Sequence, residues 1–224
     1  MLAPHMAAAN DLRQRRRSAY ETTRPDIQAL VPADARSVLD VGCASGALGA
    51  ALKQRGIERV AGIELDAALA ADARELLDQV VEGDVADVLA EPGELGSFDC
   101  VIAADVLEHL ADPWDALRSA ASLLEPGGVA VVSLPNVRNF ETFWWVGVRG
   151  RWPRREHGVF DSTHLSWFTP ADARDLLEQA GLEVRHTEPR FPFVGWRLRV
   201  AHVLARAGLE QFLASQYLLV GQRP

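Results

Sequence analysis

The first 136 residues alternate between apolar runs and amphipathic stretches. The apolar runs are short, several are rich in β-branched residues, and they predict buried strands at 37–41, 60–64, 80–82, 98–104 and 129–134. Apolar positions with helical spacing lie between them, at 45–55, 66–77 and 113–124. Because strands that alternate with helices in this way run parallel, the pattern predicts a mostly parallel sheet with helices on both faces.

The last third of the chain leaves this rhythm and then returns to it. Residues 138–165 form an insertion that is rich in tryptophan and arginine. Beyond it the pattern predicts a helix at 170–180, a strand at 182–187, a helix at 193–214 and a strand at 217–221. We therefore expect a Rossmann-like α/β fold. Its seven-stranded sheet is mostly parallel, with an antiparallel last strand at or next to an edge and a small cap insertion.

The length and composition are those of one globular domain. Apolar residues make up 48% of the 224 residues and charged residues 24%, which excludes a mainly disordered chain. We expect a single domain over 1–224, in which residues 1–35, with helical patterns at 11–20 and 25–30, form an N-terminal helical cap. No apolar run reaches the roughly 18 residues of a membrane span, so none is expected.

Cysteine and charge narrow the expected setting and partners. Cys43 and Cys100 both fall in predicted strands or at strand ends, so we expect two reduced thiols and a cytoplasmic location. Residues 1–137 carry 11 Lys+Arg against 22 Asp+Glu, whereas residues 138–224 carry 12 against 9. No basic field covers the domain, so nucleic acid is not an expected partner.

A glycine turn follows the first predicted strand in the segment LDVGCASG, residues 39–46. Small residues between a strand and a helix let backbone N–H groups approach a ligand closely. Glu64 ends the second strand and suits two ribose hydroxyls, while Asp84 closes the third strand and suits an adenine amino group. Each feature alone is common as a turn or a solvated strand end. In order along one sheet edge, they predict a nucleoside-binding crevice.

A nicotinamide-dependent oxidoreductase shares the strand–turn–helix start of this chain. Its G-x-G-x-x-G turn, placed on Gly42, needs glycines at positions 44 and 47, and both are alanine here. The residues therefore disfavour that class of enzyme.

Six segments in order resemble the successive motifs of class I S-adenosylmethionine-dependent methyltransferases: LDVGCASG, VAGIELD, GDV, FDCVIAADVLEHL, LEPGGVAVVSLPN and DSTHLSWFTP. The chain is most similar to the bacterial group of ubiquinone-type, natural-product and sugar O-methyltransferases. This resemblance implies S-adenosylmethionine as the cofactor. The cofactor-binding residues that it implies are Asp40, Gly42, Cys43, Ala44, Gly46, Glu64, Leu65, Asp84, Val85, Ala104, Asp105 and Tyr20.

The resemblance also implies which part of the cofactor each segment holds. The glycine turn would hold the methionine end, and the two acidic residues at the strand ends keep the roles given above. Ala104 and Asp105 would flank the methionyl part, and Tyr20 and Arg24 lie in a segment that often folds over the cofactor. Ala44 departs from the pattern, because the family usually has glycine there, but alanine is small enough for the turn.

Histidines supply the candidate bases. Methyl transfer from a sulfonium is an in-line displacement, so the protein aligns the acceptor and, for a hydroxyl, removes its proton. His164 follows Asp161 by three residues, and that carboxylate is expected to orient the imidazole as a base, with tying the loop to the sheet as the alternative. His109, just after the fourth strand, is a second candidate for which a structural role is favoured. No metal site is expected.

Four residues of the insertion are expected to contact the methyl acceptor: Arg154, Arg155, Trp144 and Trp152. Arginines suit a carboxylate or phosphate, and aromatic faces suit a ring. A lid that closes over an anionic acceptor is the favoured interpretation. A homodimer contact and a patch that touches a membrane surface are the alternatives.

The sequence thus predicts an enzyme that moves a methyl group from S-adenosylmethionine to an oxygen of a small molecule or peptide. The oxygen belongs to a hydroxyl or a carboxylate, and an anionic acceptor is favoured. The alternatives are an N- or C-methyltransferase and a non-catalytic cofactor-binding module that docks a protein partner. The intact glycine turn with both acidic residues favours the enzyme.

Overall fold

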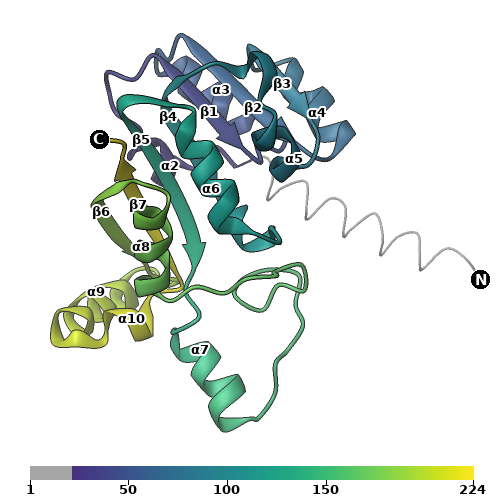
Figure 1. Cartoon of the computed structure of the whole chain (residues 1–224). Coiled ribbons are helices and arrows are strands. Elements are labelled where there is room, and N and C mark those ends of the chain that lie inside the picture. The colour runs from purple at the N-terminus through teal and green to yellow at the C-terminus, as the bar shows by residue number, and fades with distance from the viewer. Residues whose placement is uncertain (1–21) are drawn as a thin grey trace, which may run out of the picture.

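The computed structural model describes residues 22–224, so Tyr20 and the predicted helix at 11–20 lie outside the described residues. Seven strands form one sheet in the order β3-β2-β1-β4-β5-β7-β6 (Figure 1). The strands are β1 (Ser37–Val41), β2 (Arg59–Glu64), β3 (Gln79–Glu82), β4 (Phe98–Ala104), β5 (Leu124–Pro135), β6 (Glu183–Arg190) and β7 (Gln216–Gln222). Only β7 runs antiparallel to its neighbours, and it lies next to the edge strand, which confirms the predicted sheet.

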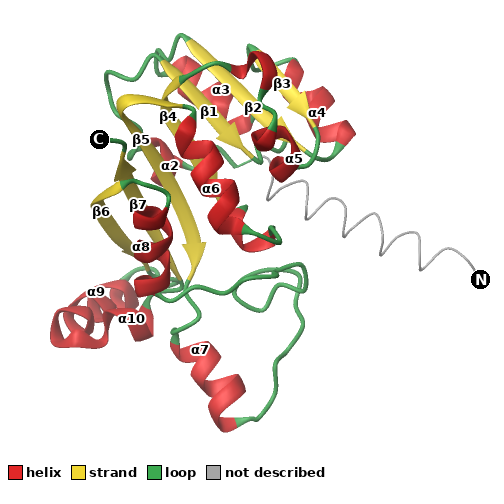
Figure 2. Cartoon of the chain, in the orientation of Figure 1, coloured by secondary structure: helices red, strands yellow, loops and turns green. Residues whose placement is uncertain are grey.

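Helices cover both faces of the sheet (Figure 2). They are α2 (Pro25–Gln28), α3 (Ala47–Gln54), α4 (Ala67–Arg74), α5 (Val85–Ala90), α6 (Pro113–Ser122) and α8 (Pro170–Gln179). One buried apolar cluster joins Val38 to α2, α3 and α4, and a second joins Leu39 and Val41 to α5, α6 and α8. Successive side chains of a strand point to opposite faces, so the alternation along β1 determines which helices each residue meets.

Three helical regions differ from the sequence prediction. The patterns do not predict α5, because it is only 6 residues long and follows β3 directly. The helix predicted at 193–214 is divided into α9 (Trp196–Leu204), the π-helical segment η4 (Ala205–Leu209) and α10 (Glu210–Leu213). Gly208 interrupts it with a φ of 89°, which lies outside helical space. Within the insertion, α7 (Phe140–Thr142) continues into the π-helical segment η3 (Phe143–Val148).

The remaining expectations on cysteine and membrane spans can be compared with the described residues. Cys43 and Cys100 are both buried and free, as predicted. Among residues 22–224, none of the helices has the length and apolar content that crossing a bilayer requires. Residues 22–224 also contain the 3₁₀ turns η1 (Gly93–Leu95) and η2 (Leu107–His109), and η2 follows the carboxyl end of β4.

Candidate active site

The carboxyl ends of β1, β2, β3 and β4 meet at one edge of the sheet, where a cavity of about 790 Å³ lies. Open α/β sheets bind ligands at such an edge, at the point where the strand order reverses. Most of the predicted cofactor residues line this cavity, namely Asp40, Gly42, Cys43, Ala44, Glu64, Leu65, Asp84, Val85, Ala104 and Asp105. Gly46 does not line it and instead begins α3, where it packs beside Ala73.

The turn between β1 and α3 brings backbone close to the cavity. Gly42, Ala44 and Gly46 all have positive φ values, of 75°, 47° and 81°. A Cβ on Gly42 would meet Cγ2 of Val106 at 3.0 Å, so only glycine leaves this approach free. Ala44 carries its methyl group in the left-handed region at a cost of roughly 1–2 kcal/mol. Its N–H donates to Oε2 of Glu64 at 2.8 Å, which ties the turn to the end of β2.

The Glu64 carboxylate is held from two sides at the cavity wall. Oε2 accepts from Ala44 N, and Oε1 accepts from Asp66 N at 2.8 Å. Each carboxylate oxygen has a second lone pair, so both remain able to accept from a diol. Asp84 lines the same wall and caps α5, where Oδ1 accepts from Ala86 N at 2.8 Å. Both acidic residues predicted to bind the nucleoside therefore line one wall of the cavity and are held there by backbone amides.

Asp40 is the buried acid at the centre of this edge, with only 3% of its surface exposed. Burial raises its pKa to about 7; the Arg24 charge opposes the shift and Glu64 adds to it. A cationic group placed beside Asp40 would reverse this shift, because it favours the carboxylate. The methionine end of S-adenosylmethionine carries such cations on its amino group and its sulfur, so the wall fits that end of the cofactor.

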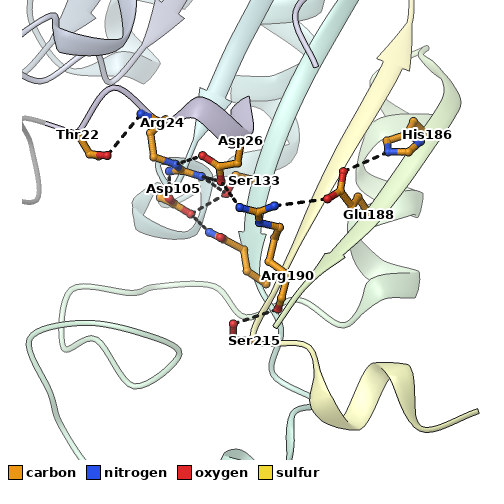
Figure 3. A network of polar contacts seen from close by, with 10 residues as sticks. Thr22, Arg24, Asp26, Asp105, Ser133, His186, Glu188, Arg190 and Ser215 are labelled. Carbon is orange, nitrogen blue, oxygen red and sulfur yellow. Dashed lines mark hydrogen bonds and ion pairs between the residues drawn. The ribbon is translucent and has the colours of Figure 1, made fainter. Parts of the chain in front are cut away.

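Arg24 organises the other side of this edge (Figure 3). Its guanidinium pairs with Asp105 and with Asp26, where Nε lies 3.1 Å from Oδ1. Ser133 Oγ donates to Asp105 Oδ1 at 2.8 Å, and Gln216 donates to the same oxygen. The sequence analysis noted Arg24 only by its neighbourhood, and no motif marked its partners. It is the single Arg or Lys that the described residues contribute to the cavity wall.

His109 is held by a chain of hydrogen bonds that starts at Asp161. Its Nδ1 lies 3.0 Å from Oγ1 of Thr163 and 3.3 Å from the Thr163 carbonyl oxygen. The Thr163 hydroxyl donates to Oδ1 of Asp161 at 2.6 Å. A hydroxyl has one proton, so both Thr163 atoms that face His109 are acceptors, and Nδ1 must carry the imidazole proton. The lone pair of His109 is therefore on Nε2.

Asp161 is a carboxylate in this chain of bonds. Burial opposes ionisation, but the hydrogen bonds from Thr163 lower the pKa of Asp161 below its ordinary value. The prediction that Asp161 orients the ring of His164 is not what the structure shows. The Asp161 carboxylate is bonded to Thr163, and the bond between Asp161 and His164 joins backbone atoms, His164 N to Asp161 O at 3.2 Å.

His164 and Glu108 form a buried pair beside His109. Burial, with the nearby His109 ring, lowers the pKa of His164, and burial raises that of Glu108 well above its ordinary value. Burial thus favours the neutral form of each side chain, and His164 Nε2 lies 3.9 Å from Glu108 Oε1. Glu108 Oε2 and His164 Nδ1 are buried and have no hydrogen-bond partner among the described residues.

Glu108, His109 and His164 also form a donor set for a cation. Each offers one ligand atom, and these atoms lie within 4.8 Å of one another. A divalent cation bound there would use imidazole and carboxylate donors, the mixture that zinc and similar metals accept. The sequence predicts no metal site there, because a glutamate after a strand end gives no sign that it will be buried against a distant histidine.

The four residues predicted to contact the acceptor do not line the cavity. Arg155 pairs with Glu141, with Nη1 2.5 Å from Oε1, and its guanidinium lies 5.4 Å from the centre of the Phe160 ring. Trp152 packs edge-on against Phe160, and Trp144 stacks with Phe140, while Arg154 is exposed. The insertion instead contributes Asn139, Glu141, Glu156, His157 and Gly158 to the wall.

Comparison with known proteins identifies the family of the chain. The methyltransferase-domain family matches residues 12–187 of the chain. A ubiquinone biosynthesis O-methyltransferase of Xanthomonas axonopodis is 34% identical over 176 residues, which cover 76% of this chain and 71% of that protein. Its counterpart in Marinobacter nauticus is 32% identical over 161 residues, 67% of this chain and 65% of that protein. The chain thus spans less than two thirds of the length of some of these relatives.

Solved structures share the fold at low identity. A SAM-dependent methyltransferase from Thermotoga maritima matches with a TM-score of 0.64 at 18% identity and covers 100% of this chain and 98% of its own. Magnesium protoporphyrin IX methyltransferase from Synechocystis, with bound SAH, matches with a TM-score of 0.60 at 19% identity, over 93% and 84% of the two chains. With the family match across most of its length, the chain belongs to the S-adenosylmethionine-dependent methyltransferases of class I.

Proposed function

We propose that this chain methylates a hydroxyl oxygen of a small molecule, with His109 as the proton acceptor. The Asp161–Thr163–His109 chain of hydrogen bonds carries the proposal. It fixes the imidazole tautomer with a free lone pair on Nε2, on a side chain that lines the cavity. A base is needed only when the acceptor enters as a neutral hydroxyl, since a carboxylate is already ionised at neutral pH.

The cofactor supplies an electrophilic methyl carbon on sulfur, and the protein supplies alignment and a proton acceptor. Glu64 accepts from the ribose, Asp84 lies on the adenine side, and Asp40 stabilises positive charge at the methionine end. Arg24, as the single wall cation, suits the α-carboxylate. The acceptor hydroxyl would lose its proton to Nε2 of His109 as its oxygen takes the methyl group, and the thioether left by the cofactor would be the leaving group.

The charge of the wall supports a neutral acceptor over the anionic one that the sequence favoured. Besides the acids at the strand ends, the cap side contributes Glu141, Glu156 and Asp161. Arg155 offsets the charge of Glu141, but Glu156 and Asp161 would repel a carboxylate, and Arg154 does not line the wall to attract one. The relatives named as ubiquinone biosynthesis O-methyltransferases also support transfer to oxygen of a small molecule.

The test is turnover with labelled S-adenosylmethionine against paired acceptors, phenols and catechols on one side and the matching benzoates on the other. We expect label in the hydroxyl compounds and none in the benzoates. The assay is run before and after treatment with EDTA. Transfer to carboxylates only would contradict the proposal. Loss of hydroxyl transfer on chelation would assign deprotonation to a cation at Glu108, His109 and His164.

A further inference from the structure

Large apolar side chains that reach solvent gather in two segments far from the cofactor turn. Segment 140–148 exposes Phe143, Trp144, Val146 and Val148, and segment 194–212 exposes Val194, Trp196, Val200, Val203, Leu209 and Phe212. The exposed fraction is 70% for Trp196 and 83% for Val194, so the rest of the fold covers little of either side chain. Exposed apolar patches of this kind mark contact surfaces.

The two segments contact each other through the ring of Phe212. The rings of Phe140 and Phe143 lie 6.2 and 5.8 Å from the ring of Phe212 on α10. A hollow of about 310 Å³ between them is lined by Phe143, Val146 and Phe212 together with Arg138. Figure 1 shows α7, α9 and α10 in the lower part of the molecule, at the end away from the edge strand β3.

Arginines surround these apolar side chains. Arg149, Arg151, Arg197, Arg199 and Arg206 are exposed, and none of them forms an ion pair with another described residue. The Arg149 guanidinium lies 5.5 Å from the Trp144 ring, and that of Arg197 lies 5.7 Å from the Trp196 ring. These apolar residues and arginines are called the arginine–apolar surface below.

The acidic residues of the same segments are already engaged. Glu141 pairs with Arg155, and Glu210 accepts from the Tyr217 hydroxyl at 3.1 Å. Glu210 keeps its charge, but the five exposed arginines outnumber it, so the arginine–apolar surface is positive, although the whole chain carries a net charge of −8. A partner that fits this surface should present apolar groups and negative charges side by side.

A second copy of the chain does not have that chemistry. In a symmetric dimer the same patch faces itself, so the unpaired arginines would meet arginines. An anionic bilayer has both properties, because its acyl region accepts tryptophan and valine while its headgroups accept guanidinium ions. We infer that the arginine–apolar surface docks this protein on the surface of a phospholipid bilayer that contains anionic lipids. This inference does not depend on the proposed acceptor.

The experiment is co-sedimentation of the full chain with vesicles of phosphatidylcholine containing 30% phosphatidylglycerol, and with vesicles of phosphatidylcholine alone. We expect binding to the first, little to the second, and release as salt rises, since exposed charges are screened. R197E/R199E should weaken binding at least tenfold, because each arginine near an anionic surface contributes roughly fivefold. W196A/V203A tests the apolar part and should also weaken it.

Matched controls use residues outside this surface. R118E changes an exposed arginine of α6, and L76A an exposed leucine just after α4; both should bind as the unchanged chain does. Thermal unfolding and S-adenosylmethionine binding confirm that each variant is folded. Equal vesicle binding by all variants, or no binding by the unchanged chain, would overturn the inference. A concentration-dependent dimer in ultracentrifugation would also overturn it, if the chain binds no vesicles and if R197E/R199E raises or W196A/V203A lowers the dimer fraction.

Discussion

The cofactor edge of the sheet and the arginine–apolar surface differ in what holds their side chains. At the cofactor edge, Glu64, Asp84 and Asp105 each bond to a backbone amide or to a side chain from another strand. On the arginine–apolar surface, Phe143 and Phe212 contact each other, and the arginines lie over tryptophans of their own segment. The first region is preorganised by the sheet, whereas the second is held by its own members and is open to a partner.

This difference explains the opposite charges of the two regions. Cationic groups of a bound cofactor favour acids at strand ends, and the sheet keeps those acids apart by a fixed strand spacing. Where the chain leaves the sheet, no strand spacing sets the positions of side chains. The insertion and α9 can therefore carry arginine and tryptophan without disturbing the pocket.

The largest expected effect lies between the two regions, at His109. His109→Ala should lower kcat by about 10²–10⁴-fold, because a general base is lost. S-adenosylmethionine affinity should stay within about twofold, since the imidazole is not assigned to the cofactor. Steady-state kinetics with a phenolic acceptor and calorimetry with the cofactor measure the two effects.

Thr163 provides a second test, because its hydrogen bond fixes the tautomer of the His109 imidazole. Thr163→Val removes the hydroxyl that accepts the hydrogen bond from His109 Nδ1 and should reduce kcat. Thr163→Ser keeps that hydroxyl and should retain most activity. His186→Ala on β6 is the control, since that ring is exposed and does not line the cavity. Full activity of His109→Ala would remove the base from the mechanism.

The next largest effect is expected at Asp40, which should change how stability depends on pH and how many protons cofactor binding releases. Its folded pKa of about 7 lies above the unfolded value of 3.8, so its contribution is present below pH 3.8 and is lost as pH rises to about 7. The upper bound of this loss is about 4 kcal/mol. Asp40→Asn should unfold at the same temperature as the unchanged chain at pH 4 and at a higher temperature at pH 8. Differential scanning calorimetry at both pH values measures this.

Cofactor binding should reverse the Asp40 shift. Cations at the methionine end favour the carboxylate, so binding near pH 6.5 should release a proton from Asp40. Titration calorimetry in two buffers of different ionisation enthalpy counts the released protons. Asp40→Asn should release fewer. An equal count in both proteins would assign the proton to another group.

The cofactor edge was largely predictable from the sequence, and the reason is geometric. Each strand of a parallel sheet delivers its carboxyl end to the same edge, so the order of Gly42, Glu64 and Asp84 along the chain already implies their proximity. The side-chain partners were not predictable. Asp161 and His164 are near in sequence, yet the Asp161 carboxylate accepts from the amide and hydroxyl of Thr163 and bonds His164 only through the backbone.

Burial was the other property that the sequence did not reveal. Glu108 follows β4 in a 3₁₀ turn, and a charged residue at such a position is usually solvated, yet only 1% of its surface is exposed. The break at Gly208 was missed for a related reason. Helical spacing continues across it, and only the backbone conformation shows that the helix ends.

Glu64 gives an intermediate effect and tests the cofactor edge alone. Glu64→Ala should weaken S-adenosylmethionine binding by roughly ten- to a hundredfold, or about 1.5–3 kcal/mol for a charged hydrogen bond. Part of that loss should come from the glycine turn, since Ala44 N loses its acceptor. Glu82→Ala is the matched control: Glu82 pairs with Glu64 in register on β3 but forms its ion pair with Arg74 outside the cavity. Similar losses in both variants would place the ribose elsewhere.

The smallest expected effects belong to Arg154 and Arg155, where the sequence predicted a clamp on an anionic acceptor. Arg155 is occupied by Glu141 and the Phe160 ring, so Arg155→Ala should cost less than about 1 kcal/mol of stability, as a partly exposed ion pair does. Arg154→Ala should change neither stability nor the KM of the acceptor, because Arg154 is exposed and does not line the cavity. Thermal unfolding measures the effect on stability. Acceptor kinetics at about 0.05 and 0.3 M salt measure the effect on KM, because exposed charges are screened more strongly at the higher concentration. A KM that rises more than fivefold in either variant, and less so at high salt, would show that the insertion closes over the acceptor. The arginines would then belong to the catalytic cavity, and the separation between the two regions would hold only for the open form of the protein.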